Sequence, residues 1–235
     1  MSIWLGGDEP HEPAVAGQQD DWLRGWAERP RSRVLDLGCG HGRTMLTLAA
    51  MGHEVIGVDR DQACLAECRS RADALGVDVR LECFDFLTDD WPGAAASCDL
   101  ICCLGNTFML VDTDEAAVVL LRRCAARLAP DGAVVLDDLP GLFVPEVESG
   151  NWQTGLSEDG SLQFIWSDRD DVFTVRSGGD VDPEGWTLGD ADVPLRLWRR
   201  PALERVAAEA GLSVVEVEPA AAVLVMRSGG PVPAG

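Results

Sequence analysis

Lysine and tyrosine are absent from the 235-residue sequence, and its 19 basic residues are all arginine. Against 40 Asp and Glu residues they leave a formal net charge of −21. Nucleic-acid binding needs a cationic surface that displaces counterions from phosphates, and anionic membranes attract the same kind of surface. The sequence therefore predicts neither a nucleic-acid partner nor a membrane partner.

Long hydrophobic runs are also absent. No apolar stretch approaches the ~20 residues that cross a bilayer as a helix, and the first residues lack the basic and apolar segments of a signal peptide. The eight cysteines lie between residues 39 and 124, and none forms a Cys-x-x-Cys pair. We therefore expect a cytoplasmic protein with buried free thiols and no metal site.

Short apolar runs alternate with segments of helical period over the first part of the chain. This alternation predicts a parallel sheet with helices on both faces. We expect strands over 33–37, 54–58, 78–83, 98–104 and 133–137, and helices over 18–28, 42–51, 61–75 and 112–128.

The pattern changes after the fifth expected strand. Alternating aromatic runs at 162–166 and 172–176 flank a polar turn and predict an antiparallel hairpin. A helix over 201–210 and two closing strands over 213–218 and 221–227 complete the expected elements.

The length favours one domain. We expect it to span residues 18–228 and to contain a small antiparallel β insert at 139–195. Residues 1–17 are expected to form an irregular arm, and residues 229–235 a flexible tail.

The most specific motif is Asp-Leu-Gly-Cys-Gly-His-Gly at residues 36–42, between an expected strand and helix. Glycines let a ligand approach the backbone closely, and the free N–H groups of a helix start favour an anionic group. Asp59 ends the next strand, where a carboxylate can bind ribose hydroxyls. Because dinucleotide sites use Gly-x-Gly-x-x-Gly instead, the spacing here favours another nucleoside cofactor.

Asp36, Gly38, Gly40 and Gly42 match the first motif of the class I S-adenosylmethionine-dependent methyltransferases, (Asp/Glu)-x-Gly-x-Gly-x-Gly. The resemblance covers residues 20–138 and resumes in the last helix and strands. It implies an α/β, Rossmann-like fold with a mostly parallel seven-stranded sheet, an antiparallel last strand and the β insert after the fifth strand. It also implies S-adenosyl-L-methionine as cofactor and S-adenosyl-L-homocysteine as product.

The resemblance assigns roles around the cofactor. Asp59 would hold the ribose hydroxyls, Asp85 would bind the adenine amino group, and Phe86 would flank the ring. The backbone at Leu104 would contact the methionine moiety. The implied cofactor-binding residues are Asp36, Gly38, Cys39, Gly40, Asp59, Arg60, Asp85, Phe86 and Leu104.

The segment 104–108, Leu-Gly-Asn-Thr-Phe, resembles the stretch after the fourth strand of glycine/sarcosine-type N-methyltransferases. It makes Asn106 a candidate for positioning the acceptor and favours nitrogen slightly over oxygen. No histidine follows His53, so any general base is expected among acids at the end of the fifth strand. We assign a catalytic role to Asp138 besides Asn106, although strand alternation leaves Asp137 equally open.

Aromatic residues on the acceptor side would clamp a ring or surround an alkylammonium group, with core packing as the alternative for each. The candidates are Trp22, Phe108, Trp152 and Trp166. Residues 137–192 hold 14 acids and 2 arginines. This charge either solvates an exposed cap or attracts a cationic acceptor.

We therefore predict an enzyme, monomeric or homodimeric, that methylates a nitrogen or oxygen of a small organic acceptor in specialised metabolism, possible acceptors including an amine. One alternative is a non-catalytic S-adenosylmethionine-binding regulatory module. A nicotinamide-dependent oxidoreductase is less favoured, because the sequence has neither its glycine spacing nor a catalytic Tyr or Lys.

Overall fold

The computed structural model describes residues 13–26, 31–91, 98–150, 152–169 and 171–229. Most of the expected arm and tail therefore lies outside the described residues. None of the helices in the described part is long and apolar enough to cross a membrane.

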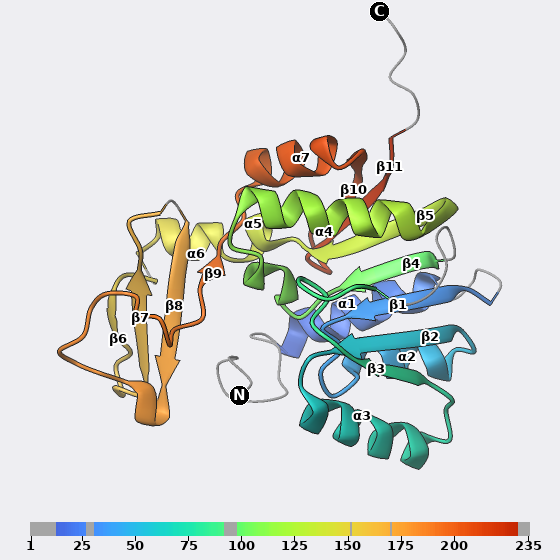
Figure 1. Cartoon of the computed structure of the whole chain (residues 1–235), viewed down its shortest axis with the longest axis horizontal. Coiled ribbons are helices and arrows are strands. Elements are labelled where there is room, and N and C mark those ends of the chain that lie inside the picture. The colour runs from blue at the N-terminus through green and yellow to red at the C-terminus, as the bar shows by residue number, and fades with distance from the viewer. Residues whose placement is uncertain (1–12, 27–30, 92–97, 151, 170, 230–235) are drawn as a thin grey trace, which may run out of the picture.

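A seven-stranded sheet forms the centre of the molecule (Figure 1), in the order β10-β11-β5-β4-β1-β2-β3. Strands β1 to β5 pair in parallel, whereas β11 runs antiparallel to both of its neighbours, β5 and β10. This confirms the predicted mostly parallel sheet with a reversed last strand. The strands are β1 (Arg33–Leu37), β2 (Glu54–Asp59), β3 (Arg80–Cys83), β4 (Cys98–Cys103), β5 (Leu128–Asp137), β10 (Leu212–Glu218) and β11 (Val223–Ser228).

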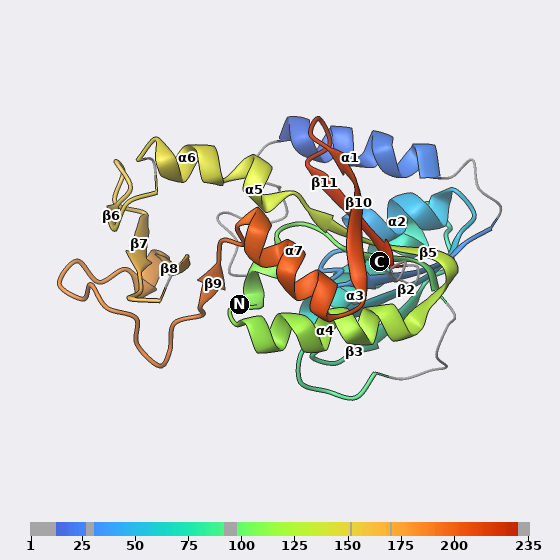
Figure 2. The same cartoon turned by 90° about the horizontal axis from the view of Figure 1, so that it is seen from above.

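Helices cover both faces of this sheet, as Figures 1 and 2 show. One face packs against the first three helices through a core that includes Leu23, Met45 and Leu65, and the other face packs against the last two long helices. The helices are α1 (Pro13–Trp26), α2 (Arg43–Ala50) and α3 (Gln62–Leu75) on one face, and α4 (Asp114–Arg127) and α7 (Arg200–Glu209) on the other.

Helix boundaries follow the capping residues. The Asp61 carboxylate accepts hydrogen bonds from the N–H groups of Ala63 and Cys64, and Gly76 ends α3 in a left-handed conformation, as predicted. Thr113 caps α4. Helix α1 begins at Pro13, earlier than the predicted start at residue 18.

The region around β5 differs most from the prediction. Strand β5 begins at Leu128 rather than at residue 133, because the ladder with β4 continues through a register shift. Two short helices then follow, α5 (Leu139–Leu142) and α6 (Val144–Glu148). Each has a proline in its first turn, where the missing N–H costs no helical hydrogen bond. The sequence analysis missed both, since neither is long enough to show a helical period.

The insert is a four-stranded antiparallel sheet in the order β6-β7-β8-β9. It confirms the predicted hairpin, with β7 (Leu162–Trp166) and β8 (Val172–Ser177) at its centre and β6 (Gly155–Leu156) and β9 (Leu195–Arg196) at its edges. Figure 1 shows this sheet beyond the end of the central sheet to which β1, β2 and β4 point. The insert therefore lies at the carboxyl edge, where open α/β sheets bind ligands.

The eight cysteines are free thiols, as predicted, and five of them are buried. Cys83 is exposed, and Cys64 and Cys98 are partly exposed, so burial was wrongly expected for these three.

Candidate active site

The glycine loop after β1 depends on backbone conformations that glycine adopts without strain. Gly38, Gly40 and Gly42 have φ values of +67°, +50° and +95°. A Cβ at Gly38 would lie 2.4 Å from the Thr107 side chain, and one at Gly42 would lie 2.5 Å from the Cys68 sulfur. A Cβ at Gly40 would meet nothing within 4 Å, so the loop is open at its middle residue.

Asp59, at the end of β2, is held by two backbone donors. Its Oδ2 accepts a hydrogen bond from the N–H of Gly40 at 2.9 Å, and its Oδ1 accepts one from the N–H of Asp61 at 2.9 Å. The residue remains partly exposed. A carboxylate has about four lone-pair sites, so the fixed side chain retains acceptor capacity for ligand hydroxyls.

Asp36 lies beneath the glycine loop and is 3% exposed. Its Oδ2 has no hydrogen-bond partner among the described residues. Burial raises the pKa of this carboxyl to about 7, against the opposing charge of Arg43. Burial likewise raises the pKa of the neighbouring Cys39 thiol. A buried carboxyl with one unpartnered oxygen, next to an open loop, suits a ligand that carries positive charge or hydrogen-bond donors.

Asp85 follows β3. Its Oδ1 accepts a hydrogen bond from the N–H of Leu87 at 2.9 Å, and its Oδ2 lies 3.8 Å from the guanidinium of Arg60. Phe86 is only 6% exposed and belongs to the larger core. This packing argues against the predicted stacking of the Phe86 ring on a ligand.

Arg123 of α4 organises this same segment, and the sequence analysis missed it. Its guanidinium donates hydrogen bonds to the carbonyls of Phe86, Leu87 and Asp89 at 3.1–3.2 Å. The indole N–H of Trp91 donates to the carbonyl of Phe86 at 2.8 Å. An arginine on a helix gives no sequence signal that it binds carbonyls of a distant loop.

The turn after β4 brings together two residues that the sequence analysis considered. Asn106 is buried, with a positive φ of 64°. Its N–H donates a hydrogen bond to Oδ2 of Asp137 at 2.5 Å. The carbonyl of Leu104 accepts a hydrogen bond from the hydroxyl of Thr107 at 2.9 Å.

The structure places Asp137, rather than Asp138, beside this turn. Burial raises the pKa of Asp137, against the lowering effect of the hydrogen bond from Gln19. The Asp138 carboxylate binds Arg200 at 2.7 Å and accepts a hydrogen bond from the N–H of Gly141 in α5. The Asp138 carboxylate therefore caps α5 and binds an arginine, which favours Asp137 over Asp138 for the position beside this turn; the catalytic role of Asp138 stays a prediction.

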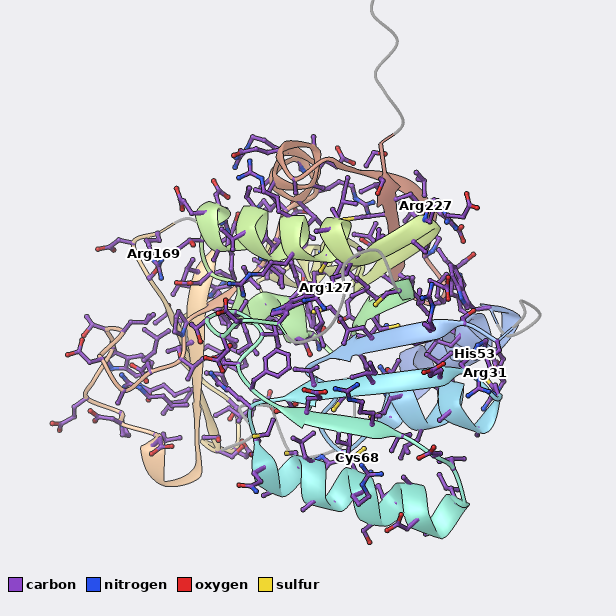
Figure 3. The ribbon with its side chains drawn as sticks, turned by 45° about the vertical axis from the view of Figure 1, so that its right-hand side comes forward. Arg31, His53, Cys68, Arg127, Arg169 and Arg227 are labelled. Atoms are coloured by element: carbon purple, nitrogen blue, oxygen red, sulfur yellow. The ribbon has the colours of Figure 1, made fainter. Side chains whose placement is uncertain are left out.

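Two histidines lie among the described residues. His53 accepts a hydrogen bond from the N–H of Ser32, and burial lowers its pKa. Figure 3 shows His53 and Arg31 at the edge of the sheet opposite the insert, which carries Arg169. His41 of the glycine loop lies 3.5 Å from Glu67 of α3. Neither is placed as a base on the acceptor side.

The predicted aromatic residues fall into three places. Phe108 is 1% exposed and packs on Trp198, which argues against contact with an acceptor. Trp22 is partly buried and packs against Trp26 with tilted rings, whose centroids are 5.8 Å apart. Trp152 and Trp166 do come together: they line a hollow of about 380 Å³ on the insert, together with Val147, Gln153, Thr154, Asp171 and Arg199.

These features fit S-adenosylmethionine, which carries two hydroxyls on its ribose, an adenine and two cationic groups. Asp59 and Asp85 present fixed carboxylates at the ends of neighbouring strands, Gly40 leaves the loop open, and Asp36 supplies a buried unpartnered oxygen. Among the described residues, no group of three or more potential metal ligands is present.

Comparison with known proteins agrees with this geometry. Residues 34–132 match the family described as "Methyltransferase domain". The "Ubiquinone biosynthesis O-methyltransferase" of Xanthomonas campestris pv. campestris (strain B100) is 28% identical over 168 residues, which cover 68% of this chain and 67% of the relative.

Two solved structures share the fold over nearly the whole chain. One is an S-adenosylmethionine-dependent methyltransferase from Clostridium acetobutylicum, with a TM-score of 0.70, 16% identity, and 92% of each chain covered. The other is the sugar N-methyltransferase KedS8 from a Streptoalloteichus species, with a TM-score of 0.63, 18% identity, and 97% of this chain and 98% of that chain covered.

The fold and the site define a Rossmann-like α/β domain of the class I methyltransferase type. The chain is similar to S-adenosylmethionine-dependent methyltransferases over the matched domain and over the fold, which supports an enzyme of that class with S-adenosylmethionine as its cofactor.

Proposed function

We propose that this enzyme transfers the methyl group of S-adenosylmethionine to a nitrogen of a small-molecule amine. The observation that carries the proposal is the tryptophan-lined hollow in an acidic insert at the carboxyl edge of the sheet. Indole faces attract ammonium groups, and residues 137–192, with 14 acids and 2 arginines, raise the local concentration of cations. The similarity to a structure described as a sugar N-methyltransferase supports the same acceptor class.

The cofactor supplies a methyl group already activated on a sulfonium sulfur. The protein therefore has mainly to align the acceptor nitrogen with that methyl for in-line displacement, and alignment can lower a barrier by ~7–11 kcal/mol. We assign ribose binding to Asp59 and adenine binding to Asp85. The backbone at Gly38, Gly40 and Leu104 would contact the methionine moiety. Cys39 and Arg60 flank these positions, and Asp36 places a buried carboxyl beneath them.

Asn106 is the residue that we propose for positioning the acceptor. Asp137 accepts a hydrogen bond from the Asn106 N–H. This contact fixes the backbone of the turn from which the Asn106 side chain projects. Asp137 already accepts hydrogen bonds from Asn106 and Gln19, and we assign it to holding this turn. An acceptor that is attracted as an ammonium ion must first lose one proton to the solvent, because only the neutral amine has the lone pair that attacks the methyl group; the neutral amine then needs no base from the protein.

Trp152 and Trp166 would hold the part of the acceptor that is remote from the reacting nitrogen. Asp171 and Arg199 line the same hollow, and the Nε of Arg199 donates to both carboxylate oxygens of Asp171 at 2.9 and 3.0 Å. The pair could therefore bind polar groups of an acceptor ring that stacks on the indoles: the Asp171 carboxylate would accept hydrogen bonds from hydroxyl or amino groups, and the Arg199 guanidinium would donate to hydroxyl oxygens.

An oxygen acceptor is the second candidate, favoured by the sequence relative described as an O-methyltransferase. A hydroxyl nucleophile needs a base to remove its proton. The acids that end β5 are already occupied, Asp137 by Gln19 and Asn106, and Asp138 by Arg200. This occupancy favours the amine.

The test is a transfer assay with matched acceptor pairs, such as an amino sugar and the same sugar with a hydroxyl at that carbon. We expect S-adenosylhomocysteine release and a singly methylated product with the amine only. Methylation of the hydroxyl compounds with inert amines would refute nitrogen transfer. Cofactor binding without turnover across the panel would favour a regulatory module.

A further inference from the structure

A buried glutamine in α1 contacts two separate parts of the cofactor site. Gln19 is 3% exposed. Its Nε2 donates a hydrogen bond to Oδ1 of Asp137 at 2.8 Å, and its Oε1 accepts one from the guanidinium of Arg43 at 2.8 Å. Asp137 ends β5, whereas Arg43 begins α2 directly after the glycine loop. One side-chain amide therefore connects three segments that are distant in sequence.

The other oxygen of Asp137 fixes the turn after β4. Gly105 and Asn106 both have positive φ, at 74° and 64°, and Oδ2 of Asp137 accepts the hydrogen bond of Asn106 N–H. Successive left-handed residues direct their N–H groups toward one anion. A left-handed asparagine persists only where the surroundings hold it, and here the carboxylate of Asp137 does so.

The charges around this carboxylate are few. Arg43 is the cation whose charge acts on Asp137, and it also lies 3.3 Å from Asp20 of α1. The charge of Asp137 also acts on the thiols of Cys102 and Cys103 of β4, and burial raises the pKa of both thiols, which keeps them neutral. The arrangement of Asp137 therefore depends on hydrogen bonds from Gln19 and the turn more than on an ion pair.

We propose that Gln19 is a positioning residue: its amide locks Asp137 and Arg43 together when α1 is seated, and so fixes the β4 turn and the start of α2 for cofactor binding. The inference rests on the proposed cofactor site and is independent of which acceptor is methylated. It makes α1 part of the cofactor site through the Gln19 amide, beside the ion pair that Asp20 of α1 forms with Arg43.

The chemistry of the amide gives two informative substitutions. Leucine has a similar size but neither donor nor acceptor, so Gln19→Leu removes both contacts. Glutamate keeps the acceptor for Arg43 but has no donor for Asp137, and it places a second carboxylate beside the first. Gln18, the preceding residue, is exposed, so Gln18→Glu makes the same charge change without these contacts.

The experiment measures S-adenosylhomocysteine binding by calorimetry for the full chain and these three variants. We expect about tenfold weaker binding or worse for Gln19→Leu and Gln19→Glu, the loss typical of one hydrogen bond to a charged group, and unchanged binding for Gln18→Glu. Wild-type affinity in Gln19→Leu would overturn the proposal, and so would wild-type affinity in Gln19→Glu, since contact with Arg43 would then suffice.

Hydrogen exchange on the wild-type chain covers the case in which a Gln19 variant does not fold. S-adenosylhomocysteine should slow exchange of the amides in α1 and in the turn at 105–107 together. Protection of the turn without α1 would refute the coupling. If the wild-type chain bound no S-adenosylhomocysteine, the cofactor assignment itself would fail. That result differs from failure of the Gln19 proposal, in which the wild type binds S-adenosylhomocysteine and the Gln19 variants bind it equally well.

Discussion

The guanidinium of Arg200 lies 2.7 Å from the carboxylate of Asp138, and this contact separates the roles of two consecutive acids. Asp138 faces α7 and the N-terminus of α5, whereas Asp137 faces α1 and the turn after β4. Successive side chains of a strand point to opposite faces, so only one of the two can serve the cofactor side.

Neutralising Asp138 should therefore mainly lower stability, whereas neutralising Asp137 should mainly weaken cofactor binding. Asp138→Asn leaves Arg200 without its partner and should lower the free energy of unfolding by about 1–3 kcal/mol, with little change in cofactor affinity. Asp137→Asn should weaken S-adenosylhomocysteine binding several-fold at a smaller cost in stability. Urea unfolding and calorimetry on both variants check this, and a larger binding loss in Asp138→Asn would contradict it.

The ribose assignment predicts loss of cofactor binding when Asp59 is truncated. Asp59→Ala removes the carboxylate that Gly40 and Asp61 orient, and Gly40→Val forces a β-branched residue into a left-handed conformation at φ +50°. Each should weaken S-adenosylhomocysteine binding by at least about 30-fold. Asp73→Ala, on the exposed side of α3, is the control and should bind as the wild type does. Binding of NADH in place of S-adenosylhomocysteine would contradict the assignment.

The order of the central strands and of the long helices could be predicted because each of these elements carries a local signal. The glycines of the loop, the cap at Asp61 and the alternation in β7 act within a few residues. The different roles of Asp137 and Asp138 could not be predicted in this way. They depend on contacts with Gln19 and Arg200, which lie 118 and 62 residues away in sequence.

The acceptor side was harder to predict for the same reason. Phe108 and Trp166 look alike in sequence, as aromatic residues near expected turns. The first is buried against Trp198, whereas the second lines the hollow on the insert. Which aromatic side chain stays accessible depends on tertiary packing, which neither period nor spacing encodes.

The raised pKa of Asp36 predicts a pH dependence of stability. Because its pKa rises from 3.8 to about 7 on folding, the native state holds a proton between these pH values that the unfolded state releases. Stability therefore falls as pH rises from about 4 to about 7. Asp36→Asn removes this penalty, so the variant should gain a few kcal/mol over the wild type across that range, measured by urea unfolding without cofactor. If the stability difference between Asp36→Asn and the wild type did not change with pH, that result would contradict the burial effect.

The hollow predicts that acceptor and cofactor binding can be impaired separately. Trp166→Leu removes an indole face but keeps an apolar side chain beside Phe173, on which Trp166 packs at 4.8 Å. The KM for the amine should rise about 5- to 50-fold, with unchanged affinity for S-adenosylhomocysteine. Trp186→Leu is the matched control, because Trp186 is 39% exposed and does not line the hollow. Equal effects of the two substitutions would contradict acceptor binding in the hollow.

The acidic insert predicts a salt-dependent reaction with cationic acceptors. Screening shortens the reach of surface charge from about 10 Å at 0.1 M salt to about 3 Å at 1 M. For an amine acceptor, kcat/KM should therefore fall about three- to tenfold between ~50 and ~500 mM salt, whereas a neutral acceptor should show little change. A variant with Glu158→Gln, Asp168→Asn and Asp190→Asn, all exposed on the insert, should lose part of this dependence. The control neutralises three exposed acids elsewhere, Glu54, Asp73 and Asp78. A flat salt response of the wild type, or the same loss in both triple variants, would show that the charge of the insert only keeps its surface solvated.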